Sequence, residues 1–102
     1  MSYGAFHHVE LFRLRPGVPI SDVRAAREAL GNLVETLPGV LSFAVTDNLA
    51  ERNAGFTMAL FSAFADRRAY DIFTRHPEYQ RVREQLLEPV VADRIVAQGD
   101  ES

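Results

Sequence analysis

The sequence predicts an α+β domain whose segments follow the order strand, helix, strand, strand, helix, strand. Three observations support this prediction. Short segments rich in β-branched and aromatic residues alternate or run continuously apolar, which is typical of strands. Longer segments carry apolar residues at helical spacing. Proline and glycine separate the segments, most clearly at Pro16–Gly17 and Pro38–Gly39.

The first half of the chain gives one strand and one helix. The strand covers residues 6–15 and ends at Pro16–Gly17. We expect Ser21 to cap the first helix, because a serine hydroxyl accepts from the free N–H groups of a first turn. The apolar stripe of this helix reaches Leu37, and Pro38–Gly39 ends it. One face of the strand carries Phe6, His8, Glu10, Phe12 and Leu14.

The second half begins with two more strands. Residues 40–46 alternate, residues 47–55 are polar and turn-like, and residues 56–64 are nearly all apolar. Such a continuous run is typical of a strand that is buried on both faces.

A broken helix and a last strand complete the pattern. Asp66 is expected to cap a helix that runs to His76, where Pro77 starts a shorter helix to about residue 87. Pro89 ends this helix, a last strand covers about residues 94–97, and residues 99–102 form a polar tail.

This order of segments is the ferredoxin-like, or split βαβ, pattern. It predicts a four-stranded antiparallel sheet with both long helices on one face. The other face is then bare, and its apolar strands predict a partner. The simplest partner is a second copy of the chain, with two sheets face to face in a two-fold dimer.

Composition narrows the classes of function. A chain of 102 residues that is 47% hydrophobic forms one domain with one core. The net charge of −3 gives no basic stripe, so we expect no nucleic-acid partner. There is no cysteine for disulfides or thiolate chemistry, and no lysine for a Schiff base. No signal peptide or apolar run of the roughly 20 residues that span a bilayer is visible, so a cytoplasmic protein without a membrane partner is expected.

Four groups of residues resemble the stress-responsive A/B barrel domain, also called the Dabb or dimeric α/β barrel domain. They are His8–Leu14, the helix end at 37–40, Asp47–Asn48 with residues 55–57, and residues 64–66 leading through Tyr70 to His76–Pro77. The resemblance covers about residues 6–98 of this single domain. It implies a homodimer whose sheets join in a barrel-like core.

Most members of this family have no assigned reaction, but its enzymatic branch contains polyketide cyclases, which close poly-β-keto chains by aldol chemistry in a cleft between the sheet and the helices. Their acid/base pair is a tyrosine three residues before the motif histidine and a histidine two residues after the motif proline. Phe73 and Tyr79 stand at these positions here. Phe73 has no hydroxyl, and a phenol titrates near ~10, so Tyr79 is a poor base. The resemblance therefore does not carry this pair over.

His8 and Glu10 are the first candidate catalytic residues. Histidine changes charge near neutral pH, which suits a general base or a hydrogen-bond donor to a ligand carbonyl. Glu10 lies two residues on, so both side chains share one face and the carboxylate can hold the tautomer of the imidazole. The alternative is a buried structural histidine that binds a backbone carbonyl, or one that pairs with Glu10 at a dimer seam.

His76 and Tyr79 are the other candidate catalytic residues. His76 precedes Pro77, so it lies at a helix junction and either lines a cleft or caps the next helix. Tyr79 either donates its hydroxyl at the mouth of the cleft or packs in an apolar stripe with Val82 and Leu86.

Phe12, Met58, Leu60 and Phe73 are the expected ligand-binding walls, although all are equally suited to a core. Tyr70 is expected in the core. A metal site would need His8, His76 and Glu10 to converge, which the spacing does not require, so we expect no metal and no cofactor. Arginines 67, 68, 75, 81 and 83 are expected on a solvated face.

Three functions fit the sequence. The first is a homodimer without catalysis that binds a small hydrophobic or polyketide-like ligand in the cleft. The second is an enzyme of polyketide-cyclase type that transfers protons through His8 and Glu10. The third resembles cofactor-free monooxygenases, which typically rely on tryptophan and asparagine in the cleft, and this chain has no tryptophan.

Overall fold

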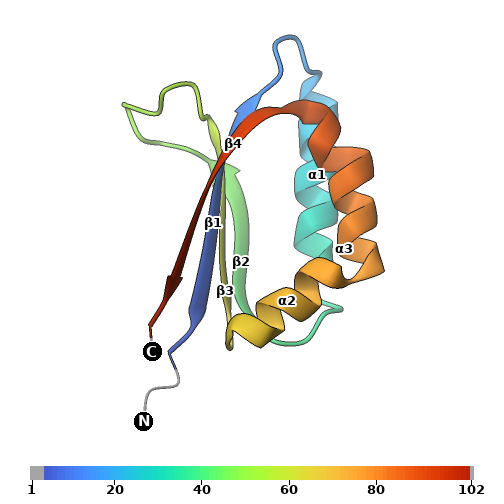
Figure 1. The fold of residues 1–102 in the computed structure, drawn as a ribbon. Helices are drawn as coiled ribbons and strands as arrows, with labels where there is room; N and C mark the ends of the chain where they lie inside the picture. Colours follow the sequence, from blue (N-terminus) through green and yellow to red (C-terminus); the bar gives the residue numbers. More distant parts are fainter. Residues whose placement is uncertain (1–3, 102) are drawn as a thin grey trace.

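The computed structural model of the chain describes residues 4–101, which form a ferredoxin-like fold with all helices on one side of the sheet (Figure 1). The predicted order of strands and helices is confirmed. The elements are β1 (Phe6–Leu14), α1 (Ile20–Leu33), β2 (Val40–Asp47), β3 (Met58–Phe64), α2 (Arg67–Arg75), α3 (Pro77–Val82), a π-helical turn η1 (Arg83–Leu87), a 3-10 turn η2 (Glu88–Val90) and β4 (Val91–Asp100).

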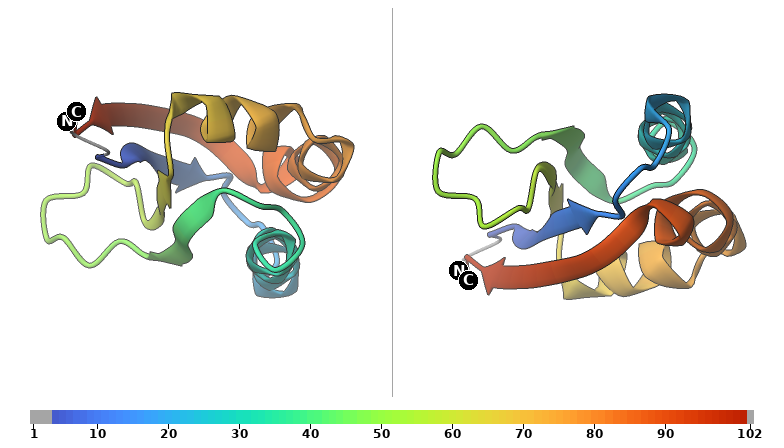
Figure 2. Two further views of the ribbon diagram at one scale, coloured as in Figure 1. Left: turned by 90° about the horizontal axis from the view of Figure 1, so that it is seen from below. Right: turned by 90° about the horizontal axis from the view of Figure 1, so that it is seen from above.

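Within residues 4–101 the sheet has four antiparallel strands in the order β2-β3-β1-β4. β1 therefore lies in the middle, between β3 and β4. The loop of residues 48–57 projects from the sheet on the side away from the helices, as the end-on views also show (Figure 2). Residues at the start of β1 pair with residues at the end of β4, so the two ends of the described chain lie side by side.

The core lies between the helices and one face of the sheet. The even-numbered residues of β1 point to this side and are buried from Phe6 to Phe12, whereas the odd-numbered residues point to the other side. Because directly opposed residues of paired strands share a face, the register places the β3 side chains 58, 60, 62 and 64 on the helix side as well. The large, fully buried side chains of the core are Phe12, Phe64, Leu30, Met58, Leu60, Leu87 and Val82.

The face of the sheet away from the helices is apolar and uncovered in the single chain. Val9 of β1 lies opposite Phe61, and Leu11 lies opposite Ile95. Phe61 and Ile95 are each 50% exposed. The prediction that β3 is buried on both faces therefore holds for its alanines, Ala59 and Ala63, but not for Phe61.

The prediction that Ser21 caps the first helix is wrong. Helix α1 begins at Ile20, and its N-cap is Pro19, which provides no side-chain hydrogen bond. The Pro19 carbonyl accepts from the N–H of Asp22 instead, so the first turn starts before Ser21. The helix also ends at Leu33, not at Leu37, although Leu37 is still buried in the core.

The last strand is much longer than predicted, and the polar tail at residues 99 and 100 belongs to it. β4 pairs with β1 from Phe6 opposite Asp100 to Leu14 opposite Val91. The sequence pattern of this strand is weak because charged and polar residues interrupt it. The pairing with β1 extends the strand beyond the predicted residues. The third strand, in contrast, begins at Met58 and not at residue 56. No helix within residues 4–101 is long and apolar enough to span a bilayer.

The helix junction at His76 is confirmed. His76 has extended backbone angles between α2 and α3, and its Nδ1 accepts from the N–H of Glu78 at 3.1 Å. The predicted cap at the start of α2 is also confirmed, since the Asp66 carboxylate accepts from the N–H of Ala69 at 2.8 Å. His76 thus has the capping role that the sequence left open.

Candidate functional site

His8 and Glu10 form a buried pair on the helix side of β1. The Nε2 atom of His8 lies 3.1 Å from the Oε2 atom of Glu10, and only 7% of His8 and 4% of Glu10 are exposed. An ionised carboxylate can only accept hydrogen bonds, so Nε2 is the donor in this contact. The expectation that the two side chains share a face is confirmed, because alternate residues of a strand point to the same side.

The second ring nitrogen of His8 contacts Gln98 on the neighbouring strand. Gln98 lies directly opposite His8 in the β1–β4 pairing, and its Nε2 lies 3.0 Å from His8 Nδ1. Since the amide nitrogen can only donate, Nδ1 accepts, which fixes the neutral tautomer with its proton on Nε2. Ser62 of β3 donates to the backbone carbonyl of His8 at 2.7 Å and holds the strand from the other side.

Glu10 also binds Arg94, which starts a chain of alternating charges. The Nη1 of Arg94 donates to Glu10 Oε1 at 3.2 Å, and its Nη2 donates to Glu88. Arg83 in turn lies 3.6 Å from Glu88. Burial acts to raise the pKa of Glu10, but the hydrogen bond from His8 and the charge and hydrogen bond of Arg94 outweigh it, so this pKa lies below its usual value. Glu10 is therefore a carboxylate at neutral pH.

These groups lie at a cleft between the sheet and the helices, as the sequence led us to expect. The cleft has a volume of about 230 Å³ and a small extension of about 10 Å³ reaches further into the core. Its walls come from β1, β4, α2, α3 and η1, and the residues are His8, Glu10, Tyr70, Thr74, Tyr79, Arg83, Arg94, Val96 and Gln98.

Two tyrosines complete the cleft. Burial is the main cause that raises the pKa of Tyr79 to about 12, and the nearby Glu10 carboxylate adds to it. Burial and Glu10 raise the pKa of Tyr70 in the same way. Both phenols therefore stay protonated at neutral pH, where they can donate hydrogen bonds but cannot act as bases. The Tyr79 ring also packs on Phe73, with ring centroids 4.9 Å apart.

The other residues predicted for the site divide into two groups. Leu60 and Phe73 line the inner extension of the cleft, whereas Phe12 and Met58 are core residues that line neither space. His76 lies on a different pocket, of about 500 Å³, formed by α1 and α3, so the structure does not bring it together with His8. Among residues 4–101, no group of three histidine or acidic side chains is placed to hold a metal ion.

Sequence reasoning missed Tyr70, Arg83, Arg94 and Gln98. Tyr70 packs against the core and Arg83 is exposed, as expected, but both also line the cleft, which the sequence did not indicate. Arg94 and Gln98 belong to a strand that was predicted too short. The available signal was the spacing of two between residues 94, 96 and 98, which places all three on one face of a strand.

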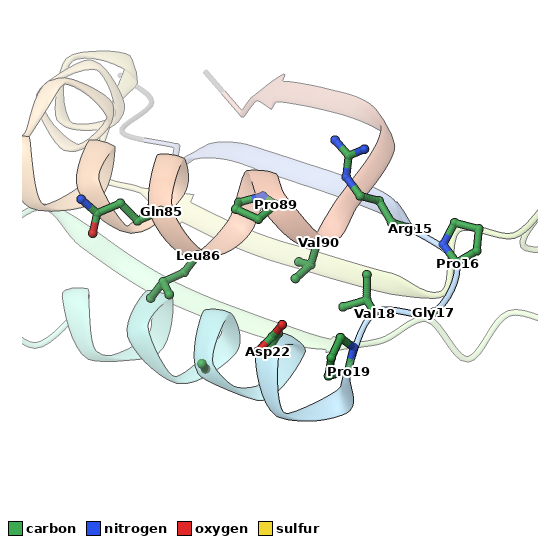
Figure 3. A pocket seen from close by; sticks show the side chains of 11 residues that line it. Arg15, Pro16, Gly17, Val18, Pro19, Asp22, Gln85, Leu86, Pro89 and Val90 are labelled. Atoms are coloured by element: carbon green, nitrogen blue, oxygen red, sulfur yellow. The ribbon is translucent and has the colours of Figure 1, made fainter.

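A larger groove lies elsewhere, between the start of α1 and the turns η1 and η2 (Figure 3). It has a volume of about 470 Å³. Its charged side chains, Arg15 and Asp22, make no hydrogen bond or ion pair with other groups among the described residues. Because it lacks a buried titratable group, the cleft at His8 is the better candidate site.

Comparisons with known proteins agree with this fold. The family model of the stress responsive A/B barrel domain matches residues 6–98. A comparison with curated proteins found no match.

Several solved structures share the fold of the whole chain. A dimeric ferredoxin-like protein of unknown function from Thermobifida fusca is 20% identical, with a TM-score of 0.83 over 98% of this chain and 93% of that chain. A hydroxynitrile lyase from Passiflora edulis is 17% identical, with a TM-score of 0.87 over 99% of this chain and 96% of that chain. A Dabb family protein from Mesorhizobium loti is 17% identical, with a TM-score of 0.80 over 94% and 95% of the two chains.

Proposed function

This chain belongs to the stress responsive A/B barrel domain family, and we propose that it is a homodimer that binds a small, mainly apolar ligand in the cleft over His8. The observation that carries the ligand site is the buried pair of His8 and Glu10 at the wall of that cleft. Buried titratable groups that line a cleft and carry a specific charge partner are typical of functional sites, so this pair supports a ligand site in the cleft.

The open face of the sheet supports the homodimer. Phe61 and Ile95 are half exposed there, and the neighbouring Val9 and Leu11 extend the apolar surface. Two such faces can pack against each other as aligned sheets, which removes the apolar side chains of both copies from water. The related structure from Thermobifida fusca is described as dimeric, which supports the same assembly here.

The size and lining of the cleft support a small ligand. A volume of about 230 Å³ lies below the usual range for drug-sized ligands, so a single aromatic ring with a short side chain fits better than an extended chain. The apolar contacts come from Val96 and the rings of Tyr70 and Tyr79. The other side chains of the lining are polar or charged and orient the polar group of the bound molecule.

Binding is tested with toluene and acetophenone, which we expect to shift the amide and side-chain NMR signals of His8, Thr74 and Val96. Thr74 lines both the cleft and its extension, so Thr74→Phe should fill the cleft and abolish these shifts. Ala25→Phe is the matched control, because it adds the same ring to the groove of Figure 3 and should leave binding unchanged. Shifts that survive Thr74→Phe would place the ligand elsewhere and overturn the proposal.

The homodimer has its own test. Analytical ultracentrifugation at micromolar concentration should give twice the mass of the chain. A stable single subunit at that concentration would refute the proposed assembly without affecting the ligand test.

A second candidate is an enzyme of polyketide-cyclase type, which the pair of His8 and Glu10 favours. Since Nε2 of His8 donates to Glu10, Nδ1 is the nitrogen that can accept a proton once Gln98 releases it. In such a step the proton on the carbon beside a ketone moves to Nδ1, and the electron pair of the C–H bond forms an enolate. The carboxylate of Glu10 then faces the imidazolium and stabilises its charge. The hydroxynitrile lyase with the same fold supports the idea that this scaffold can carry an enzymatic reaction.

Exchange of the side-chain protons of phenylacetone in D₂O tests this candidate by NMR. The wild-type chain should accelerate the exchange, and His8→Ala should return it to the rate of buffer. Unchanged exchange and unchanged binding in His8→Ala would remove the catalytic proposal, and the binding proposal would remain.

A further inference from the structure

The two tyrosines of the cleft offer hydroxyl protons that the protein itself does not use. The Nε2 amide of Gln98 donates to the Tyr70 hydroxyl oxygen at 3.2 Å, so in this contact the oxygen accepts and its proton stays available. Within residues 4–101, neither Tyr70 nor Tyr79 donates a hydrogen bond to another protein group. An occupant of the cleft therefore meets donors and has to supply an acceptor.

The charge around these hydroxyls favours a neutral acceptor. Burial is the main cause that raises the pKa of Tyr70. The Glu10 carboxylate raises it further, because it disfavours a negative charge at the phenol oxygen. The same repulsion acts on an anionic ligand group that approaches the hydroxyl. The two arginines of the cleft, Arg83 and Arg94, act in the opposite direction, but their charges are already paired with Glu88 and Glu10. A carbonyl oxygen is neutral, accepts hydrogen bonds and carries no proton of its own, so it matches this end of the cleft.

A hydrogen bond orients the hydroxyl of Tyr70, whereas Tyr79 is held by the packing of its ring. The amide nitrogen of Gln98 contacts both the Tyr70 hydroxyl and the Nδ1 atom of His8, and the His8 and Tyr70 rings lie 4.9 Å apart. Gln98 thus joins the hydroxyl to the imidazole. Because the Tyr70 oxygen accepts from Gln98, its proton has to point elsewhere. The Tyr79 hydroxyl has no such partner among the described residues.

We propose that Tyr70 recognises the carbonyl oxygen of a small neutral ketone or aldehyde, and that Gln98 is the positioning residue that orients the Tyr70 hydroxyl. This inference rests on the proposed function, since it names the class of ligand bound in the cleft over His8. The two residues, Tyr70 on α2 and Gln98 on β4, are not part of the His8–Glu10 pair. They also do not stand at the positions of the cyclase pair.

Acetophenone and ethylbenzene provide a matched pair of probes, because they share the ring and the length of the side chain and differ in the carbonyl oxygen. NMR titration of the full-length chain should give a dissociation constant for acetophenone about tenfold lower than that for ethylbenzene, the usual effect of one buried hydrogen bond. Tyr70→Phe removes only the hydroxyl and should abolish this preference. Tyr79→Phe is the matched control and should retain it.

Gln98→Met separates a positioning role from a structural one. It should reduce the preference for acetophenone by about threefold, a fraction of one hydrogen bond, and leave the affinity for ethylbenzene unchanged. A fall in affinity for both probes would mean that Gln98 only maintains the shape of the cleft, and its positioning role would be rejected. The amide spectrum of each variant establishes that it is folded.

The outcomes separate this inference from the proposed function. Equal affinities of the wild-type chain for both probes, with shifts at His8, would reject carbonyl recognition and leave ligand binding intact. Absence of shifts with either probe would reject both. Loss of the preference in Tyr79→Phe, and not in Tyr70→Phe, would assign the carbonyl to Tyr79 and overturn the role of Tyr70.

Discussion

The helix-covered face of the sheet buries His8, Glu10 and Ser62, whereas the uncovered face leaves Phe61 and Ile95 half exposed. On the covered face each buried polar group has a partner, and no buried side-chain nitrogen or oxygen among residues 4–101 lacks one. On the uncovered face the alanines Ala59 and Ala63 are buried, but the larger side chains of Phe61 and Ile95 are not covered. The covered face thus buries a polar cluster together with the apolar core, whereas the uncovered face exposes apolar side chains.

A single chain satisfies the hydrogen bonds of its buried polar groups, but it leaves the apolar surface of its uncovered sheet face in contact with water. Buried polar groups are tolerated when they are hydrogen-bonded, and the covered face satisfies this within one chain through β1, β3 and β4. An apolar surface is tolerated when it is removed from water, and the uncovered face has no means of this within one chain. The covered face is therefore suited to a site, and the uncovered face to a second copy.

The largest expected effect comes from a charge on the uncovered face. Phe61→Glu places a carboxylate in each half of a two-fold interface, where it is desolvated and unpaired. We expect the dissociation constant of the dimer to rise by about a thousandfold or more, measured by analytical ultracentrifugation.

The control for this substitution is Ile72→Glu on α2. Ile72 is exposed to a similar extent, 54%, but lies outside the sheet face, so the dimer should persist. If Phe61→Glu sediments like the wild-type dimer, the uncovered face is not the interface.

A smaller loss is expected on the covered face. Glu10→Gln keeps the shape of the side chain but removes the charge that both His8 and Arg94 contact. Breaking a buried pair of this kind lowers the free energy of unfolding by about 3 kcal/mol. Chemical denaturation measures the change, and Glu78→Gln, an exposed partner of Arg81, should change it by less than about 0.5 kcal/mol. Equal losses in both variants would refute the importance of the buried network.

The effect of Glu10 should also depend on pH. Its pKa in the folded chain lies below the ordinary value of 4.5, so the folded state favours the ionised form and binds fewer protons than the unfolded state. The contribution of Glu10 to stability is therefore fully present above pH 4.5 and is lost as the pH falls through the depressed pKa. The difference in stability between wild type and Glu10→Gln should shrink over this range. A difference that grows on acidification would show that the pKa of Glu10 is raised in the folded chain and not lowered.

The smallest effect concerns the loop beside the uncovered face. Arg13 donates to the carbonyl of Ala54 at 3.1 Å, and its guanidinium lies 4.6 Å from the centre of the Phe56 ring. Arg13→Gln should lower the free energy of local opening of residues 48–57 by about 1 kcal/mol, measured by amide hydrogen exchange. Arg15→Gln, which removes the same charge without such contacts, should leave the exchange of this loop unchanged.

The fold could be predicted well from local patterns, and the candidate site only in part. The order of elements, the cap at Asp66 and the junction at His76 follow from spacing and from the restrictions that proline imposes on its neighbours. The shared face of His8 and Glu10 follows from the period of a strand. The start of α1 at Ile20 was missed because Pro19, and not Ser21, precedes its first turn.

The sequence by itself determined which residues can form strands and helices and which neighbours share a face, because these preferences act over a few residues. Only the tertiary structure decided that Arg94 reaches Glu10 across 84 positions and that Gln98 reaches His8 across 90. The full length of β4 comes from its pairing with β1, and that register places Gln98 directly opposite His8 and Arg94 two positions from Val96, the residue opposite Glu10. The distance between His76 and the cleft was likewise set by how α3 packs on α1, which no local pattern encodes.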